Sequence, residues 1–492
     1  MTDRKERKIL LINPCPREIV VDFLPKNLPL ALLSVASTLV DSYEVILLDR
    51  AVEKNDNRLL QLLKDPGLAV AGISCLSGPM IKDAVYCSKL IKETNPAITV
   101  VWGGWHPTKD PDSVLACPHV DYLIQGEGEL SFRAFVDAFG DVKAQKQVSG
   151  IGFREGNAFR YLPGQTLDIN ALPSLPIHLI NDITPYVIYN WVPGGGICIP
   201  WETSRGCPYS CTFCDVTYQF GSNYNCHTPE RMIYDIKRLQ KQFAIGGIRF
   251  YDPNFFLRID RVKRFSDLLI EERSSFRWAA SGTINQFKNI SVETLGHFYS
   301  AGLRYVEFGI ESGDEEIRHQ LLNKRFKTDE IYRVLQRFHE AGIQFKFNLI
   351  IGIPGETPEQ SEKTLRFALD ILEKYPNASI GGHLYIYMPF PGTDLQKKAV
   401  AMGYKPPVTL EQYADLDYST SQSNPWLSRQ HSSMLEAIST MSYFLSAPSS
   451  AIPLAGLKRL FFIAARAFYL FRLKNRLFMK TPDLALLAKV LH

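Results

Sequence analysis

Three cysteines lie close together near the middle of the 492-residue chain: Cys207, Cys211 and Cys214, in the spacing C-x3-C-x2-C. Thiolates at this spacing on one loop can converge on a soft metal centre. Three protein ligands leave part of an iron–sulfur cluster open to substrate, whereas a structural zinc site normally takes four. Cys226 is the only nearby fourth candidate, at an unusual spacing for zinc. Three buried free thiols are the alternative, although free cysteines are rarely so bunched.

The aromatic residue Phe213 precedes the last of these cysteines, and the whole motif resembles that of the radical S-adenosylmethionine superfamily. The resemblance implies that Cys207, Cys211 and Cys214 hold a 4Fe–4S cluster whose open iron binds the amino and carboxylate groups of S-adenosylmethionine. It also implies that the reduced cluster cleaves the sulfonium to give a 5′-deoxyadenosyl radical. The protein would then position cofactor and substrate and exclude side reactions.

Through about the first 145 residues, short apolar strands alternate with amphipathic helices. This alternation predicts an α/β domain with a doubly wound parallel sheet, whose ligands bind at the carboxyl ends of the strands. Glycines at two of those ends allow a large flat ligand to approach the backbone. No G-x-G-x-x-G follows the first strand, so a dinucleotide is not favoured. The expected strands are 8–13, 43–49, 68–74, 98–102 and 121–124, and the expected helices are 28–39, 58–63, 81–93 and 130–139.

Two segments of this domain, 102–107 (WGGWHP) and 120–129 (VDYLIQGEGE), resemble the cobalamin-binding domain found ahead of many radical S-adenosylmethionine enzymes. The Asp-x-His-x-x-Gly signature whose histidine ligates cobalt is absent. We therefore expect His106 to be a hydrogen-bonding residue rather than a cobalt ligand. The resemblance places the loop after the third strand on the lower face of the cobalt. The implied cobalamin-binding residues are Cys75, Leu76, Ser77, Gly103, Gly104, His106, Gly126, Glu127 and Gly128.

Residues 146–196 are rich in Pro and Gly and predict a linker. Between residues 197 and 395, strands and helices alternate again and match the partial β/α barrel of the superfamily, with cofactor contacts at the carboxyl ends of the strands. The expected strands are 197–204, 247–251, 277–281, 305–308, 345–351 and 383–388, and one expected helix begins at residue 314. We assign residues 396–492 to a helical carboxyl-terminal region that selects the substrate.

Several of these barrel strands end in segments that resemble the S-adenosylmethionine-binding motifs of the superfamily. Asp252 resembles a residue near the methionine amino group, with a solvated turn as the alternative. Glu311 and Ser312 could hold the ribose or methionine moiety, although Ser312 could equally be a helix N-cap. Ile353 lies in a glycine-containing segment that resembles the one packing on adenine, but Glu356 comes one residue early for a role there. The implied S-adenosylmethionine-binding residues are Phe213, Asp252, Ser281, Glu311, Ser312 and Ile353.

A formal net charge of +4 over this length does not indicate a nucleic-acid partner. Nine cysteines and the absence of a signal-peptide pattern predict a reducing, cytoplasmic location. Residues 457–477 combine apolar and basic side chains, and Arg466 interrupts the only apolar run, so a spanning helix is not expected. This segment predicts an amphipathic helix that either lies on an anionic membrane surface or, as we favour, packs on the barrel.

Together these resemblances predict a cobalamin-dependent radical methyltransferase that acts on an unactivated carbon of a small molecule. The same motifs also fit a cobalamin-dependent cyclase or rearrangement oxidoreductase acting on a tetrapyrrole or a lipid-like substrate. A nonenzymatic cobalamin sensor is a third hypothesis, disfavoured by the barrel with its cluster loop. The expected cofactors are a 4Fe–4S cluster, S-adenosylmethionine and cobalamin, and the expected reductant is a flavodoxin or a ferredoxin. No catalytic residue is assigned beyond these binding residues.

Overall fold

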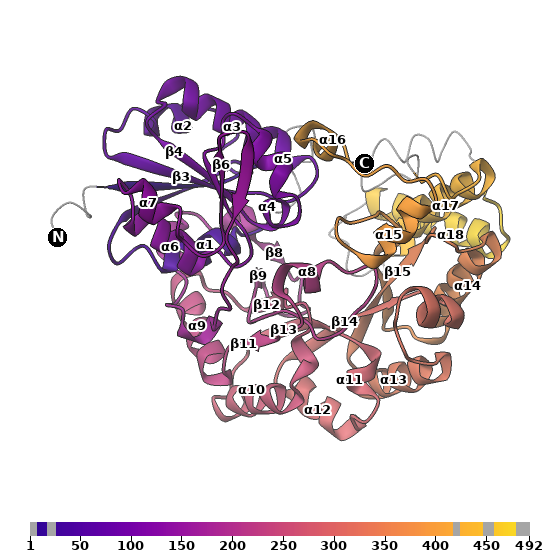
Figure 1. The fold of residues 1–492 in the computed structure, drawn as a ribbon. Helices are drawn as coiled ribbons and strands as arrows, with labels where there is room; N and C mark the ends of the chain where they lie inside the picture. Colours follow the sequence, from indigo (N-terminus) through magenta and orange to yellow (C-terminus); the bar gives the residue numbers. More distant parts are fainter. Residues whose placement is uncertain (1–6, 17–25, 417–423, 446–456, 479–492) are drawn as a thin grey trace.

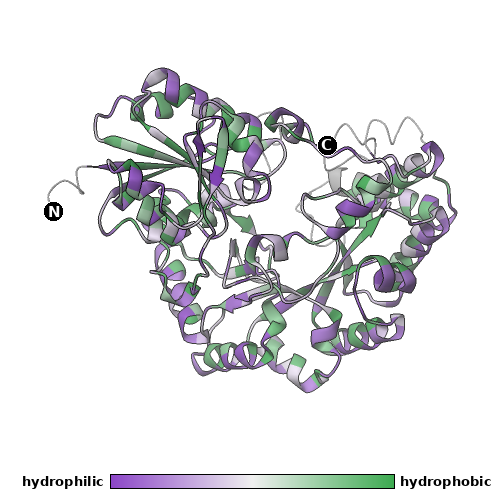
Figure 2. Cartoon of the chain, in the orientation of Figure 1, coloured by the Kyte–Doolittle hydropathy of each residue, from purple (hydrophilic) through white to green (hydrophobic). Residues whose placement is uncertain are grey.

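The structure is a computed structural model of the chain, and it describes residues 7–16, 26–416, 424–445 and 457–478. Two mixed α/β units lie one above the other in Figure 1, each built around a seven-stranded sheet. In Figure 2 the strands are mostly green and the outer helices carry purple faces, which is the pattern of sheets buried beneath amphipathic helices. The predicted α/β class is therefore confirmed.

The first sheet has the strand order β2-β1-β3-β4-β5-β6-β7. Its first five strands are parallel, and the order 2-1-3-4-5 is that of flavodoxin-like doubly wound sheets. Side chains alternate between two cores: Leu10 and Ile12 pack on one face, Ile9 and Leu11 on the other. The strands are β1 (Lys8–Asn13), β2 (Glu44–Asp49), β3 (Leu68–Ser74), β4 (Thr99–Gly103), β5 (Tyr122–Ile124), β6 (Ile151–Glu155) and β7 (Ala158–Tyr161); the helices are α1 (Leu30–Ser37), α2 (Asn57–Leu62), α3 (Met80–Thr94), α4 (Trp105–Lys109), α5 (Pro111–Ala116), α6 (Glu129–Asp137) and α7 (Val142–Gln145).

The predicted linker is too long at its amino end. Strands β6 and β7 form an antiparallel hairpin that extends the first sheet to Tyr161, inside the range expected to be a connector. The two strands are only five and four residues long, so they carry no long apolar run, and the antiparallel pairing of β6 with β5 makes the hairpin part of the sheet. The remaining connector carries three short 3-10 turns, η1 (Ile169–Ala171), η2 (Ile177–Leu179) and η3 (Thr184–Tyr186).

The second sheet has the order β16-β15-β14-β13-β12-β9-β8, and its six strands from β9 to β16 are parallel. It curls as a partial barrel with helices on its outer face (Figure 1). The strands are β8 (Ile188–Tyr189), β9 (Ile197–Trp201), β12 (Gly247–Phe250), β13 (Arg277–Gly282), β14 (Leu303–Glu311), β15 (Gln344–Ile351) and β16 (Ala378–Ile386). The helices are α9 (Pro229–Phe243), α10 (Ile259–Glu271), α11 (Ile284–Phe287), α12 (Val292–Ser300), α13 (Thr328–Glu340) and α14 (Pro358–Lys374), with a π-helical turn η5 (Ile317–Leu321) where a longer helix from residue 314 was expected.

The carboxyl-terminal region returns to both units. Its helix α16 (Leu410–Ala414) packs on α3 of the first unit, and α17 (Arg429–Ser442) packs on β16 of the second. Helix α18 (Leu457–Lys474) contacts α17 and the turn η6 (Tyr443–Leu445), and its Tyr469 and Leu473 join the core of the partial barrel. Within the described residues, no helix is both long and apolar enough to cross a membrane. The remaining helix of this region is α15 (Asp394–Ala401).

Candidate cofactor and active site

The cysteine motif forms the loop between β10 (Ser204–Arg205) and α8 (Val216–Phe220). Strand β10 pairs with β11 (Asn225–Cys226), and this small hairpin supports the base of the loop. Gly206 has φ +76°, and a Cβ there would overlap the carbonyl oxygen of Asn223, so only glycine fits where the loop begins. The loop is also tied to the end of η5 by Thr212, which donates from its amide to Leu322 O (3.4 Å) and from its hydroxyl to Leu321 O.

All three cysteine side chains are half-buried and reduced. Burial, together with the neighbouring thiolates, raises the pKa of Cys214 to about 12, and burial first of all also raises the pKa of Cys211. Within the described residues, no three His, Cys, Asp or Glu side chains stand close enough to share one metal ion. Three half-buried thiols that form no disulfide and lie on one loop are the donor set of a 4Fe–4S cluster that keeps one iron open to another ligand.

A buried ion pair faces this loop from the end of β14. Glu311 accepts from the Lys324 ammonium (2.9 Å), which also donates to Gly309 O (2.6 Å). Glu311 has φ +71°, an uncommon conformation for a residue with a side chain, and such strain concentrates at functional sites. The Lys324 ammonium lies 5.6 Å from the ring centre of Phe213. Two of the predicted residues, Phe213 and Glu311, are thus brought together, and Lys324 is a neighbour that sequence reasoning missed.

The other predicted S-adenosylmethionine residues divide into two groups. Ile353 is buried in a small apolar cluster that also receives Phe213, so it lies beside the cysteine loop. Ser281 instead points to Arg249 on the neighbouring strand, whose guanidinium donates to its hydroxyl (2.7 Å). Glu356 accepts from the amides of Gly352 (2.5 Å) and Ile353 (3.0 Å) and so shapes the turn that presents Ile353.

Asp252 and Ser312 are occupied by internal hydrogen bonds. The buried Asp252 carboxylate accepts from the Thr203 amide (2.7 Å), the Thr203 hydroxyl (2.7 Å) and the Ser204 hydroxyl (2.6 Å). It is therefore not the solvated turn weighed as the alternative, but a brace between the ends of β12 and β9. The Ser312 hydroxyl accepts from the Asp314 amide (3.1 Å) and contacts the Thr364 hydroxyl (3.0 Å), which is a local capping role.

Most of the predicted cobalamin residues gather at the carboxyl ends of β3, β4 and β5. The Cys75 amide donates to Gly103 O (2.9 Å) and the His106 amide donates to Cys75 O (3.0 Å), which joins the first two loops. Gly104 has φ +97°, and a Cβ there would press on the Cys75 backbone. Leu76 leaves 47% of its surface exposed on this edge, and Gly126 has open space where a Cβ would stand. Exposed apolar surface beside bare backbone suits a large flat cofactor.

His106 is held away from any ligand role. It is fully buried, its Nδ1 lies 3.0 Å from the Ser77 hydroxyl and its Nε2 lies 3.2 Å from the Ser113 hydroxyl. Burial lowers its pKa to about 4, so the ring is neutral near pH 7. Neutral imidazole flanked by two hydroxyls explains why this histidine anchors the loop instead of facing outward.

The variant His106→Gln should therefore not change the coordination of the cobalt. Because both ring nitrogens have hydroxyl partners, the expected cobalt(II) electron paramagnetic resonance spectrum is the same for wild type and variant. The variant should lose stability, since a buried hydrogen-bonded ring is replaced. Nitrogen hyperfine splitting present in the wild type and lost in the variant would show that His106 does ligate cobalt.

Charged contacts join the cobalamin edge of the first sheet to the cysteine loop. Lys109 in α4 forms an ion pair with Asp215, the residue after Cys214. Arg205, two residues before Cys207, pairs with Glu127 (3.1 Å) and Glu129 (2.7 Å) of the first unit and with Glu202 (2.9 Å) of its own. These largely buried pairs connect the loops that carry the two sets of predicted cofactor residues.

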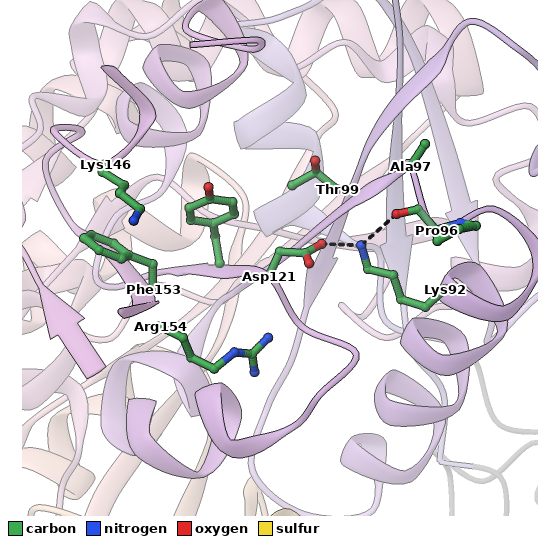
Figure 3. Close-up of a pocket in the computed structure, with 9 residues that line it drawn as sticks. Lys92, Pro96, Ala97, Thr99, Asp121, Lys146, Phe153 and Arg154 are labelled. Carbon is green, nitrogen blue, oxygen red and sulfur yellow. Dashed lines mark hydrogen bonds and ion pairs between the residues drawn. The ribbon is translucent and has the colours of Figure 1, made fainter. Parts of the chain in front are cut away.

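A cavity of about 220 Å³ lies at this junction, lined in part by Gly126, Glu127, Arg205, Gln219 and Phe220. A larger cavity of about 390 Å³ lies at the opposite, amino-terminal edge of β4 and β5 (Figure 3). Its cations are already engaged: Lys92 pairs with Asp121 (2.5 Å), Lys146 lies 4.0 Å from Glu155, and Arg154 donates to the carbonyls of residues 115, 117 and 120. The smaller cavity is the one next to the cofactor residues.

Two family descriptions match the chain: the radical SAM superfamily over residues 201–368 and the B12 binding domain over residues 18–136. An uncharacterized methyltransferase of Pyrococcus horikoshii is 29% identical over 85% of this chain and 90% of its own length. The anaerobic magnesium-protoporphyrin IX monomethyl ester cyclase of Rubrivivax gelatinosus is 26% identical over 64% of this chain, which spans just over half (56%) of that protein. The structure of the cobalamin-dependent S-adenosylmethionine radical enzyme OxsB, with aqua-cobalamin and S-adenosylmethionine bound, superposes with a TM-score of 0.72 at 18% identity and covers 95% of this chain and 72% of that one.

A B12-binding sheet followed by a partial barrel with a three-cysteine loop defines a radical S-adenosylmethionine enzyme with a second, cobalamin-binding domain. The chain belongs to the cobalamin-dependent radical S-adenosylmethionine enzyme family. Its cofactors are accordingly a 4Fe–4S cluster, S-adenosylmethionine and cobalamin.

Proposed function

We propose that this enzyme transfers a methyl group to an unactivated carbon of a small molecule, with Cys207, Cys211 and Cys214 as the cluster ligands. The observation that carries the proposal is the buried contact between the cobalamin edge and the cysteine loop, made by Lys109 with Asp215 and by Arg205 with Glu127 and Glu129. When bound, the cluster with S-adenosylmethionine supplies a hydrogen-abstracting radical and cobalamin supplies a methyl group. Two cofactors held face to face could act on one substrate carbon from the two sides.

The residues around the cysteine loop have positioning roles in this proposal. Lys324 neutralises and orients the strained Glu311 carboxylate, which then presents fixed acceptors beside the cluster. Phe213 and Ile353 form an apolar wall next to that carboxylate, and such a wall excludes water from a reactive site. Asp252 and Ser312 have a positioning role in this proposal: they hold the ends of their strands in place. The proposed reductant is a flavodoxin or a ferredoxin. Residues 396–492 are the proposed region that selects the substrate.

A deuterium-transfer experiment tests the reaction type. With a substrate deuterated at the reacting carbon, each turnover should give one S-adenosylhomocysteine and one 5′-deoxyadenosine that carries the deuterium, because a polar methylation would need no hydrogen abstraction. Mass spectrometry of both nucleosides measures this directly. Methylated product without deuterium in 5′-deoxyadenosine would rule out the radical step, and labelled 5′-deoxyadenosine without S-adenosylhomocysteine would favour a cyclase, the activity named for the Rubrivivax relative.

A further inference from the structure

The inner face of the partial barrel carries a row of polar and charged side chains, of which only Ser281 belongs to the predicted S-adenosylmethionine-binding residues. Along β12, β14 and β15, the outward residues Phe250, Phe308 and Phe347 join the core beneath the outer helices. The residue directly before each phenylalanine points to the opposite, inner face, because side chains alternate along a strand. These residues are Arg249, Glu307 and Lys346. The strand register aligns Ser281 with Glu307 and Glu307 with Lys346, so these polar side chains form one row across three strands.

The second cation of this row, Lys346, is the less well balanced one: burial lowers its pKa, and the nearby Glu307 charge only partly opposes this. Arg249 donates to Glu307 (2.8 Å), to Ser281 (2.7 Å) and to the carbonyl of Phe250, and Asn348 donates to the other Glu307 oxygen (2.8 Å). Although burial opposes it, Arg249 lowers the pKa of Glu307. The carboxylate is therefore ionised, and both of its oxygens already accept hydrogen bonds from Arg249 and Asn348. The Lys346 ammonium makes no hydrogen bond or ion pair with any residue that the structure describes; it lies 4.4 Å from the ring centre of Tyr305.

Two further polar atoms beside Lys346 are unsatisfied. Among the described residues, the Tyr305 hydroxyl and the Asn348 side-chain oxygen are buried without a hydrogen-bond partner, and Tyr305 is only 1% exposed. Buried polar groups are normally paired, and unpaired ones mark a place where another molecule binds or where strain is stored. A donor, an acceptor and a free cation on one face match the needs of a polar, negatively charged ligand.

The depth of this row separates it from the cofactor residues. Glu307 precedes Glu311 by four residues on β14, which is about 13 Å along an extended strand. Two exposed rings flank the row in the sheet: Tyr251 follows β12, with its ring centre 5.9 Å from the Arg249 guanidinium, and Tyr385 lies in β16. A molecule whose anionic end rests on the row and whose other end reaches the cluster residues would therefore be elongated.

We infer that Lys346, with the Tyr305 hydroxyl and the Asn348 side-chain oxygen, binds the anionic group of the substrate, a carboxylate or a phosphate. This inference rests on the proposed function, since it places that substrate inside the same barrel. Lys346 would neutralise the anion, Tyr305 would donate to it, and Asn348 would accept from a neighbouring hydroxyl or amino group of the ligand. Arg249 acts only as a positioning residue, because its donors hold Glu307 and Ser281.

Competitive labelling of lysines tests the site without turnover. The reconstituted full-length protein is treated with limiting isotope-coded acetic anhydride, with or without inorganic phosphate or lactate, and labelled peptides are quantified by mass spectrometry. Either anion should slow labelling of Lys346 about tenfold, because a charge-assisted contact shields the amine. Lys374, an exposed lysine that also lies over tyrosine rings, is the internal control and should not change. Protection by phosphate alone or by lactate alone identifies the anion class, and equal labelling of Lys346 under all conditions would overturn the inference.

Variants separate this inference from the proposed function. By calorimetry, Lys346→Gln and Tyr305→Phe should weaken binding of the protective anion about tenfold or more, while Lys346→Arg should retain most of it. All three should keep the cluster and cobalamin spectra and the substrate-free cleavage of S-adenosylmethionine, because none lies in the cofactor machinery. Anion binding by Lys346→Gln at wild-type strength would refute the site while leaving the reaction untouched. Anion binding that persists in a protein shown not to transfer methyl groups would refute only the proposed function.

Discussion

The triple variant Cys207→Ala/Cys211→Ala/Cys214→Ala should lose its iron and keep its cobalamin. The wild-type chain is expected to bind about four irons, the content of one cubane cluster, and the variant none. Cobalamin binding should survive because the first sheet has two cores of its own, and domains with separate cores keep their ligand sites. The ion pairs that join the two units do not involve the cysteines, since they are made by Lys109, Arg205 and their carboxylate partners. Iron analysis and the visible spectrum of the purified variant measure both outcomes.

Cys226→Ala is the matched control for this variant. Cys226 is half-buried like the three motif cysteines and lies in β11, paired with the strand that enters the cysteine loop. Because it lies outside the motif, its removal should leave the iron content at the wild-type level. Retention of about four irons by the triple variant would disprove the ligand assignment, and loss of the metal from the Cys226 variant would revive a four-cysteine site.

Individual strands could be predicted from the sequence because apolar runs are a local pattern. The expected strands 8–13 and 345–351 match the observed β1 and β15 to within one residue, whereas the strand order comes from the structure. The hairpin of β6 and β7 could not be predicted, because its strands are only five and four residues long and it joins the sheet through the pairing of β6 with the distant β5. Where a helix was expected the chain forms the turn η5, and the buried Arg318 in it donates to Ser312 O (2.7 Å) and to the Thr328 hydroxyl (2.7 Å), contacts that a motif does not encode.

Only part of the candidate site could be predicted from the sequence. Cys207, Phe213 and Ile353 carry short-range spacing that a motif can register. The partners that join the site together have no such signal, because Lys109 contacts Asp215 across 106 positions and Lys324 reaches Glu311 from the far side of a turn. The hydrogen bonds that Asp252 accepts from Thr203 and Ser204 likewise have no signal in the sequence, and its contact with the cofactor stays a prediction. Long-range charge pairing is therefore the information that only the folded chain supplies.

Arg205→Met should be the most destabilising single change among the charged residues discussed. The guanidinium contacts Glu127, Glu129 and Glu202 and donates to the Ser34 hydroxyl (3.2 Å), and the Arg205 side chain is only 10% exposed. Methionine keeps the volume but leaves three partly or fully buried carboxylates without their cation, and breaking a buried network in this way costs about 3–5 kcal/mol. The expected fall in melting temperature is on the order of 10 °C, measured by calorimetry. Arg366→Met is the control, because its pair with Glu362 is 60% exposed on the arginine side and should contribute less than about 1 kcal/mol.

The pH dependence distinguishes a lost cation from a simple packing defect. In the wild type Arg205 lowers the pKa of Glu129 against the opposing effect of burial, so this carboxylate stabilises the fold above its ordinary value of 4.5 and ceases to do so as the pH falls through its lowered pKa. In Arg205→Met the same carboxylate is buried without a cation, its pKa rises above 4.5, and the fold is penalised increasingly as the pH rises. Both effects make the difference in melting temperature large at pH 8 and small near pH 4. A difference that stays constant over this range would mean that the methionine side chain merely packs poorly and that Arg205 does not hold the two units together through charge.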